Sequence, residues 1–205
     1  MFVAFLGLPG AGKSTLARAF AKEISAQAFL EPEENEWPDY VRHPHPDGDF
    51  TRLMWFRAQR VPSYYAASTI SAEGGRAVLD SYYDKWCEGW LGKPGLEWLI
   101  SPQDHYFEVA ARAASIDRQR LPSADVVVLL EISIDLWLEQ LQERDRTIDQ
   151  SDPFLASHHT QRYFLEAAEA RAESDGTSLV RYRRQRLTPM DEARLLVQDL
   201  RACGL

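Results

Sequence analysis

The chain has 205 residues, of which 45% are hydrophobic and 26% are charged, and its formal net charge is −8. This length and composition are ordinary for a folded globular protein and suffice for one α/β domain with a sizeable core. The acidic balance argues against a nucleic-acid-binding protein, because such proteins usually carry a basic face.

The beginning of the chain predicts a strand, a glycine loop and a helix. Phe2 to Leu6 is apolar on both faces, as in a buried parallel strand, and it lacks the basic start of a signal peptide. Gly7 to Gly12 interrupts this run, and residues 13–25 then place apolar side chains at helical spacing.

Short apolar runs alternate with helical patterns through the rest of the chain. This alternation predicts a three-layer α/β fold, with a parallel sheet of about five strands and helices on both faces. Residues 1–205 are expected to form a single domain, because no linker divides them. Pro62 is expected to kink the long helix that contains it. Further strands are predicted at 28–31, 77–80, 125–131 and 178–182, and further helices at 50–72, 82–90, 102–120, 134–144, 154–173 and 190–203.

The loop from Gly7 to Ser14 is the most specific functional motif, because it fits the Walker A pattern G-x-x-x-x-G-K-S. Its glycines let backbone amides wrap around phosphate oxygens, Lys13 adds a positive charge, and Ser14 offers a hydroxyl to Mg²⁺. The motif lies between a predicted strand and a predicted helix, whose N-terminus favours anions. We therefore expect ATP and Mg²⁺ to bind here. The residues expected to bind the nucleotide are Gly7, Leu8, Pro9, Gly10, Ala11, Gly12, Lys13, Ser14 and Thr15.

Two acidic residues and two arginines lie where phosphoryl transfer would need them. Glu31 and Asp80 end the second and third predicted strands, so both are expected at the sheet edge that carries the phosphate loop. Arg144 and Arg146 lie where a helix gives way to a polar loop, which is typical of a lid; we place this lid at about 144–154. Transfer to a hydroxyl needs a base, a Mg²⁺ site and cations over the phosphates, and these residues are the candidates.

Other phosphate-loop proteins are less well supported. The chain has no D-x-x-G and no N-K-x-D, which disfavours a GTPase, and it is shorter than the large motor ATPases. A small chain with an early phosphate loop fits the nucleoside and nucleotide kinases best.

Several segments resemble the deoxynucleoside kinases. Residues 29–32, Phe-Leu-Glu-Pro, followed by Trp37, are similar to that family's Glu-Pro…Trp segment. Residues 78–81 fall where the family has Asp/Glu-Arg-Ser, and residues 128–146 are similar to its strand and lid. The resemblance covers most of the chain, and is strong in the phosphate loop and weak between about 84 and 120.

The resemblance implies a P-loop kinase that phosphorylates the 5′-hydroxyl of a nucleoside with ATP. It implies that Glu31 is the general base and that Asp80 orders the waters of Mg²⁺. Because the long helix covers the acceptor pocket in that family, Trp55, Phe56 and Arg60 become candidates for substrate binding. It also implies a homodimer.

Two departures from the family leave alternatives open. Ser81, and not an arginine, follows Asp80, and Leu53 falls where the family reads the base with a glutamine. One alternative is a kinase of the same fold that acts on a nucleotide or another small hydroxyl acceptor. The other is a nucleotide-binding module without catalysis.

The remaining features are consistent with a cytoplasmic protein that binds a small molecule, without nucleic acid or a membrane. Cys87 and Cys203 have no metal-site spacing and are expected to be free thiols in a reducing compartment. No apolar run approaches the roughly 20 residues that span a bilayer. The histidines show no ligand spacing. Most aromatic residues at helical spacing are expected in the core, namely Tyr64, Tyr65, Tyr82, Tyr83, Trp86 and Trp90.

Overall fold

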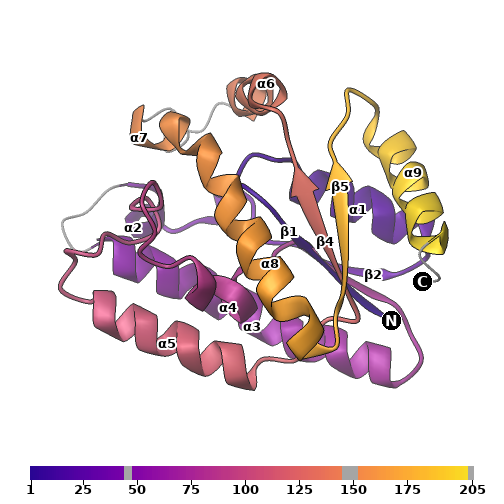
Figure 1. The fold of residues 1–205 in the computed structure, drawn as a ribbon, viewed down its shortest axis with the longest axis horizontal. Helices are drawn as coiled ribbons and strands as arrows, with labels where there is room; N and C mark the ends of the chain where they lie inside the picture. The colour runs from indigo at the N-terminus through magenta and orange to yellow at the C-terminus, as the bar shows by residue number, and fades with distance from the viewer. Residues whose placement is uncertain (44–47, 145–151, 203–205) are drawn as a thin grey trace.

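A computed structural model describes residues 1–43, 48–144 and 152–202. Five strands form one parallel sheet in the order β2-β3-β1-β4-β5 (Figure 1), which confirms the predicted fold class. The strands are β1 (Phe2–Leu6), β2 (Gln27–Phe29), β3 (Ala77–Leu79), β4 (Val126–Glu131) and β5 (Ser178–Arg183).

Helices connect the strands and cover both faces of the sheet. None of them, within the described ranges, is long and apolar enough to cross a membrane. The α-helices are α1 (Lys13–Glu23), α2 (Asp39–Arg42), α3 (Gly48–Ala72), α4 (Tyr83–Trp86), α5 (Phe107–Arg120), α6 (Ile134–Arg144), α7 (Asp152–Leu155), α8 (Gln161–Asp175) and α9 (Pro189–Ala202); 3₁₀ turns are η1 (Glu34–Glu36), η2 (Cys87–Gly89) and η4 (Ala156–Thr160).

The central strand β1 is buried along its whole length, because it lies between β3 and β4 and under helices on both sides. Its register places Ala4 opposite Leu79 on one side and Val127 on the other. Alternate residues of β1 then enter two separate cores. Val3 packs with residues of α1 and α9, whereas Ala4 packs with residues of α3, α4 and α8.

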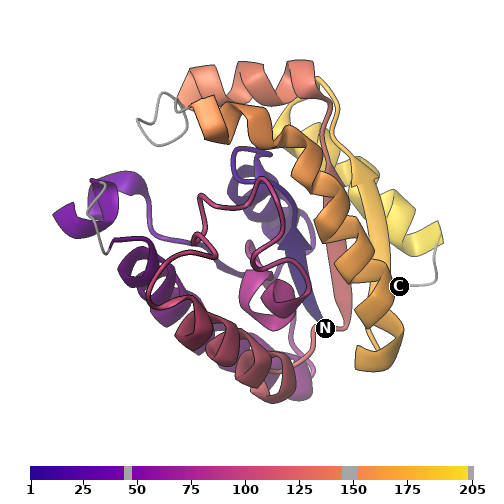
Figure 2. The same cartoon turned by 60° about the vertical axis from the view of Figure 1, so that its left-hand side comes forward.

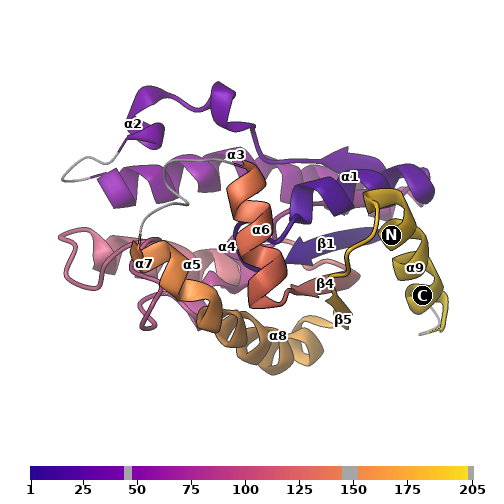
Figure 3. The same ribbon diagram turned by 90° about the horizontal axis from the view of Figure 1, so that it is seen from above.

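The two cores define the layers. Figure 1 shows α8 crossing one face of β4 and β5, with α1 and α9 on the other face. Helix α5 lies outside α3 and α4 and contacts both of them. At the carboxyl edge of the sheet, α6 lies above the glycine loop (Figures 2 and 3). There Trp137 of α6 donates a hydrogen bond from Nε1 to the carbonyl of Pro9 at 2.8 Å.

Three details of the predicted helices need correction. The helix predicted at 102–120 begins only at Phe107, because residues 101–107 form successive turns. The helix predicted at 82–90 is a single α-turn, α4, followed by η2. The helix predicted at 154–173 is divided into α7, the 3₁₀ turn η4 and α8. Helix α3 continues through Pro62 from Gly48 to Ala72, and its kink at that residue stays a prediction.

Candidate active site

The glycine loop links β1 to α1 in a conformation that only glycine adopts without strain. Gly10 and Gly12 have φ angles of +78° and +74°, in the left-handed region. There is also no room for a side chain at Gly12, since a Cβ atom there would lie 2.1 Å from the guanidinium of Arg184. The glycine pattern therefore serves both the turn itself and the close packing of Arg184 against it.

Lys13 lies inside this loop, with only 7% of its surface exposed. Its Nζ donates to the carbonyls of Gly7 and Leu8, at 3.1 and 2.9 Å, and to the hydroxyl of Tyr83 at 3.1 Å. An ammonium has three donors, so each one has a partner. Burial lowers the pKa of Lys13 to about 8, although the carboxylates of Glu31 and Asp80 oppose this shift.

Tyr83, at the start of α4, connects this lysine to the rest of the site. Its hydroxyl accepts from Lys13 and donates to the carbonyl of Gly7. The ring lies 5.0 Å from Lys13 Nζ and 5.7 Å from the Arg60 guanidinium carbon, measured from the ring centroid. Tyr83 belongs to the core, as the aromatic spacing predicted, and its ring also forms part of the cavity wall between two cations.

Asp80 follows β3 directly and faces the loop. Both of its carboxylate oxygens accept from the backbone N–H of Glu31, at 3.0 and 3.2 Å. Burial raises the pKa of Asp80 to about 6; the charge of Glu31 adds to this, and a hydrogen bond from Ser14 opposes it.

Asp80 and the Ser14 hydroxyl suit Mg²⁺ in their chemistry. Mg²⁺ in phosphate sites usually takes one or two protein oxygens and keeps several waters. Within the described ranges, no group of three histidine, cysteine, aspartate or glutamate side chains forms a denser metal site. The donor set therefore fits a metal that is shared with phosphates.

Glu31 lies two residues beyond β2, beside Asp80 and Lys13. Arg60 of α3 donates from Nη1 to Glu31 Oε1 at 2.7 Å, and binds Asp84 through two bonds of 2.6 and 3.0 Å. Burial alone would raise the pKa of Glu31, but Arg60 and Lys13 outweigh it and hold this pKa below its usual value. Glu31 is thus a charged acceptor whose side chain keeps 23% exposure.

Arg60 places a guanidinium in the site even though no arginine follows Asp80 in the sequence. The side chain at that position, Ser81, is buried and brings no charge. Arg60 instead supplies a guanidinium beside Glu31 from α3. Asp84 orients it, because the two-bond pairing fixes the plane of the guanidinium.

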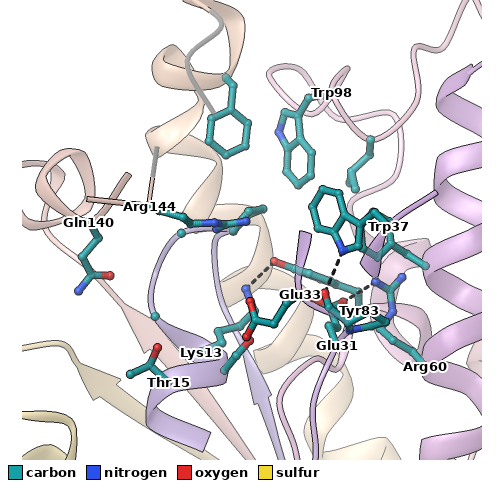
Figure 4. A pocket seen from close by; sticks show the side chains of 18 of the residues that line it. Lys13, Thr15, Glu31, Glu33, Trp37, Arg60, Tyr83, Trp98, Gln140 and Arg144 are labelled. Atoms are coloured by element: carbon teal, nitrogen blue, oxygen red, sulfur yellow. Dashed lines mark hydrogen bonds and ion pairs between the residues drawn. The ribbon is translucent and has the colours of Figure 1, made fainter. Parts of the chain in front are cut away.

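One cavity of about 620 Å³ is lined by Lys13, Ser14, Glu31, Arg60, Tyr83 and Asp84 (Figure 4), whereas Asp80 and Ser81 are buried and are not among its lining residues. Glu31 and Tyr83 lie between its two parts, which we name by their walls. The loop end is lined by Pro9, Gly10, Gly12, Lys13, Ser14, Thr15, Gln140, Glu143, Arg144, Arg184, Leu187 and Pro189. The aromatic end is lined by Trp37, Arg52, Leu53, Phe56, Arg60, Asp84, Cys87, Trp90, Trp98, Leu99 and Phe154.

The other predicted site residues have different positions. Phe56 and Arg60 line the aromatic end, but Trp55 is not among the lining residues and its ring packs against Trp37 and Phe56. Arg144 ends α6 and lines the loop end. Arg146 and most of the predicted lid at 144–154 lie outside the described residues.

Several site residues were missed by the sequence analysis. Arg184 follows β5, donates to the carbonyl of Ala11 and forms a buried ion pair with Glu192 at 2.7 Å. Asp84 and Trp98 come from the segment where the resemblance is weak. Each of these residues reaches the cavity from a different element and carries no motif of its own.

The comparisons with known proteins agree with this geometry. No protein-family model matches the chain. A thymidylate kinase of Xylella fastidiosa is 28% identical over 158 residues, which are 72% of this chain and 65% of that protein, so the match spans less than two thirds of the relative.

Solved structures give a fuller match. Structures of deoxyadenosine kinase from M. mycoides with bound dATP and with bound dCTP have TM-scores of 0.69 and 0.63 at 16% identity. Each match covers 98% of this chain and 100% of the other. Together with the five-stranded parallel sheet and the glycine loop, these matches show that the chain has the P-loop kinase fold of the nucleoside and nucleotide kinases.

Proposed function

We propose that the protein is a phosphotransferase that uses ATP to phosphorylate the 5′-hydroxyl of a nucleoside-like acceptor. One observation carries this proposal. A charged carboxylate, Glu31, lies between a phosphate-binding loop and an aromatic pocket within a single cavity. A phosphoryl donor and a ring-bearing acceptor can therefore meet at one base.

The loop end would hold the triphosphate. Amides of the loop and the N-terminus of α1 point at the phosphates, and Lys13 exchanges its carbonyl partners for phosphate oxygens. Ser14 and Asp80 would hold Mg²⁺, which neutralises phosphate charge when bound. Arg144 lines this end of the cavity, and Arg146 follows it in sequence; both are proposed to neutralise charge on the transferred group.

Glu31 would act as the general base. Arg60 keeps its carboxylate ionised, so it can accept the proton of the acceptor hydroxyl. As that proton moves to Glu31, the acceptor oxygen bonds to the γ-phosphorus and the bond to the ADP oxygen breaks. Arg60 and Asp84 hold Glu31 in place during this step.

The charges of the aromatic end favour an uncharged acceptor. Its described cations are Arg60, which Glu31 and Asp84 both bind, and Arg52, which Asp49 binds at 2.8 Å. Among the residues that the structure describes, no excess positive charge remains there for an acceptor phosphate. A nucleoside monophosphate is the second candidate, and the likeness to a thymidylate kinase favours it.

A coupled assay for ADP formation tests the proposal. The purified protein, ATP and Mg²⁺ are combined in turn with each natural ribo- and deoxyribonucleoside and with its monophosphate. We expect turnover with nucleosides, and a Glu31→Gln variant whose kcat is about 10²- to 10⁴-fold lower at similar ATP affinity.

Glu36→Gln is the matched control, because Glu36 lies in the same acidic segment, does not line the cavity and accepts a hydrogen bond from the backbone N–H of Glu33. It should keep full activity. Turnover with monophosphates alone would establish the second candidate instead. ATP binding without turnover on any acceptor would leave a nucleotide-binding module and refute the kinase.

A further inference from the structure

Three residues of α3 line the aromatic end at a spacing of four positions. Arg52, Phe56 and Arg60 lie on one face of the helix, because side chains four positions apart are neighbours there. Arg60 reaches Glu31, where the acceptor hydroxyl would bind. Arg52 lies about 12 Å farther along the helix axis. It therefore meets the part of an acceptor that is most distant from the reacting hydroxyl.

Arg52 is held in place and still has donors to offer. Its Nη2 donates to Asp49 Oδ1 at 2.8 Å and to the carbonyl of Trp98 at 2.7 Å. A guanidinium carries five donors and no acceptor. Its Nε and Nη1 have no protein partner among residues 1–43, 48–144 and 152–202. Since Arg52 lines the cavity, a ligand can use these donors.

A second donor group lies beside it. Figure 4 shows the indole of Trp98 projecting into the cavity above Trp37. The Nε1 atoms of Trp98 and Trp90 are buried and have no hydrogen-bond partner in the described part of the chain. An indole nitrogen only donates.

Each acceptor near this end already accepts from an arginine. Both carboxylate oxygens of Asp84 accept from Arg60, and the carbonyl of Trp98 accepts from Arg52. The neighbouring walls, Leu53 and Leu99, are apolar. An exocyclic amino group directed at Arg52 would meet only further donors, whereas a carbonyl oxygen there would accept from a charged donor.

We propose that the aromatic end selects rings that carry an exocyclic carbonyl oxygen over rings that carry an amino group, and that Arg52 determines this selection. The inference rests on the proposed function for its acceptor class. It adds a chemical preference and assigns that preference to one residue.

Two matched pairs of nucleosides test the selection. Inosine and adenosine share a purine and differ in an oxo or amino group at one position and in the hydrogen on the neighbouring ring nitrogen; uridine and cytidine differ in the same way for a pyrimidine. We expect kcat/KM to favour the oxo member of each pair by about tenfold or more. In Arg52→Met the ratio should fall to within about threefold of unity, and in Arg52→Lys a preference should return, because the ammonium still donates.

Arg76→Met serves as the control. Arg76 also binds a backbone carbonyl, that of Ile24, but it is exposed and does not line the cavity. Its variant should keep the wild-type ratio. Equal use of both members, a preference for the amino members, or an unchanged ratio in Arg52→Met would overturn the inference.

Binding measured by the fluorescence of the cavity tryptophans separates this inference from the proposed function. The same four nucleosides give dissociation constants without any turnover. An oxo preference in binding with no phosphorylation would refute the kinase and keep the selection. Phosphorylation without the oxo preference would support the kinase and refute the selection.

Discussion

The loop end and the aromatic end of the cavity are built in opposite ways. At the loop end, half of the lining residues belong to one contiguous segment, residues 9–15, whose backbone is proposed to bind phosphate; the others come from α6 and from residues 184–189. The aromatic end is assembled from side chains of α3, α4 and the segments around Trp37 and Trp98. A loop of this kind can be predicted from a short sequence motif. The aromatic end cannot, because its side chains are distant in sequence and meet only in the folded chain. We therefore expect substitutions at the two ends to affect different properties.

The largest effect is expected at Arg60, a residue of the aromatic end, and it is a loss of unfolding free energy. Arg60→Met leaves Glu31 and Asp84 close together without their shared cation, and Asp84 is buried. Breaking a buried ion pair by removing one partner costs about 3–5 kcal/mol of unfolding free energy. Urea denaturation of the variant measures this loss. Wild-type stability would show that the pairing contributes nothing net to the fold.

At the loop end, substitution of Lys13 is expected to lower turnover more than stability. Lys13→Ala removes the charge that faces the phosphates, and turnover should fall about 10²- to 10³-fold. The unfolding free energy should change less than in Arg60→Met, because burying the ammonium already opposes folding, as its lowered pKa indicates. Steady-state kinetics and urea denaturation on the same sample check both statements. A loss of stability equal to that of Arg60→Met would remove the contrast between the two ends.

Tyr83 joins the ends, and its hydroxyl should give the smallest effect. Tyr83→Phe keeps the ring between Lys13 and Arg60 but removes one hydrogen bond to each of Lys13 and Gly7. We expect kcat/KM for ATP to fall by about fivefold, the equivalent of about 1 kcal/mol. Tyr82→Phe is the matched control, because the Tyr82 hydroxyl is also buried but accepts from Ala124. Equal losses in both variants would mean that Tyr83 acts only through packing.

The inner strands β1, β3 and β4 could be predicted because they are short apolar runs that are buried on both faces. The positions of Glu31 and Asp80 followed from one rule, that parallel strands end at the same edge. Their contact, a hydrogen bond from the Glu31 backbone to the Asp80 carboxylate, agrees with that expectation.

The rest of the site could not be predicted from the sequence, for physical reasons. Asp84 pairs with Arg60 across 24 positions, and neither residue indicates the other until α3 packs on α4. Trp98 lies in turns without periodicity, so no pattern marks its indole as part of a wall. The start of the helix at Phe107 was misplaced because the turns before it are fixed by local hydrogen bonds, and not by apolar spacing.

The contact between Arg184 and Ala11 has a consequence for synthesis on the ribosome. The two residues are separated by 173 positions, and Arg184 is itself fixed by Glu192 in α9. The motif of the loop is translated among the first residues of the sequence, but its packing partner emerges only after nearly all of the described chain. A nascent chain released before α9 would carry the complete glycine-loop motif, but the guanidinium that packs against Gly12 would lack Glu192, the residue that fixes it. The packing of the glycine loop is thus completed only when β5 and α9 have both been made.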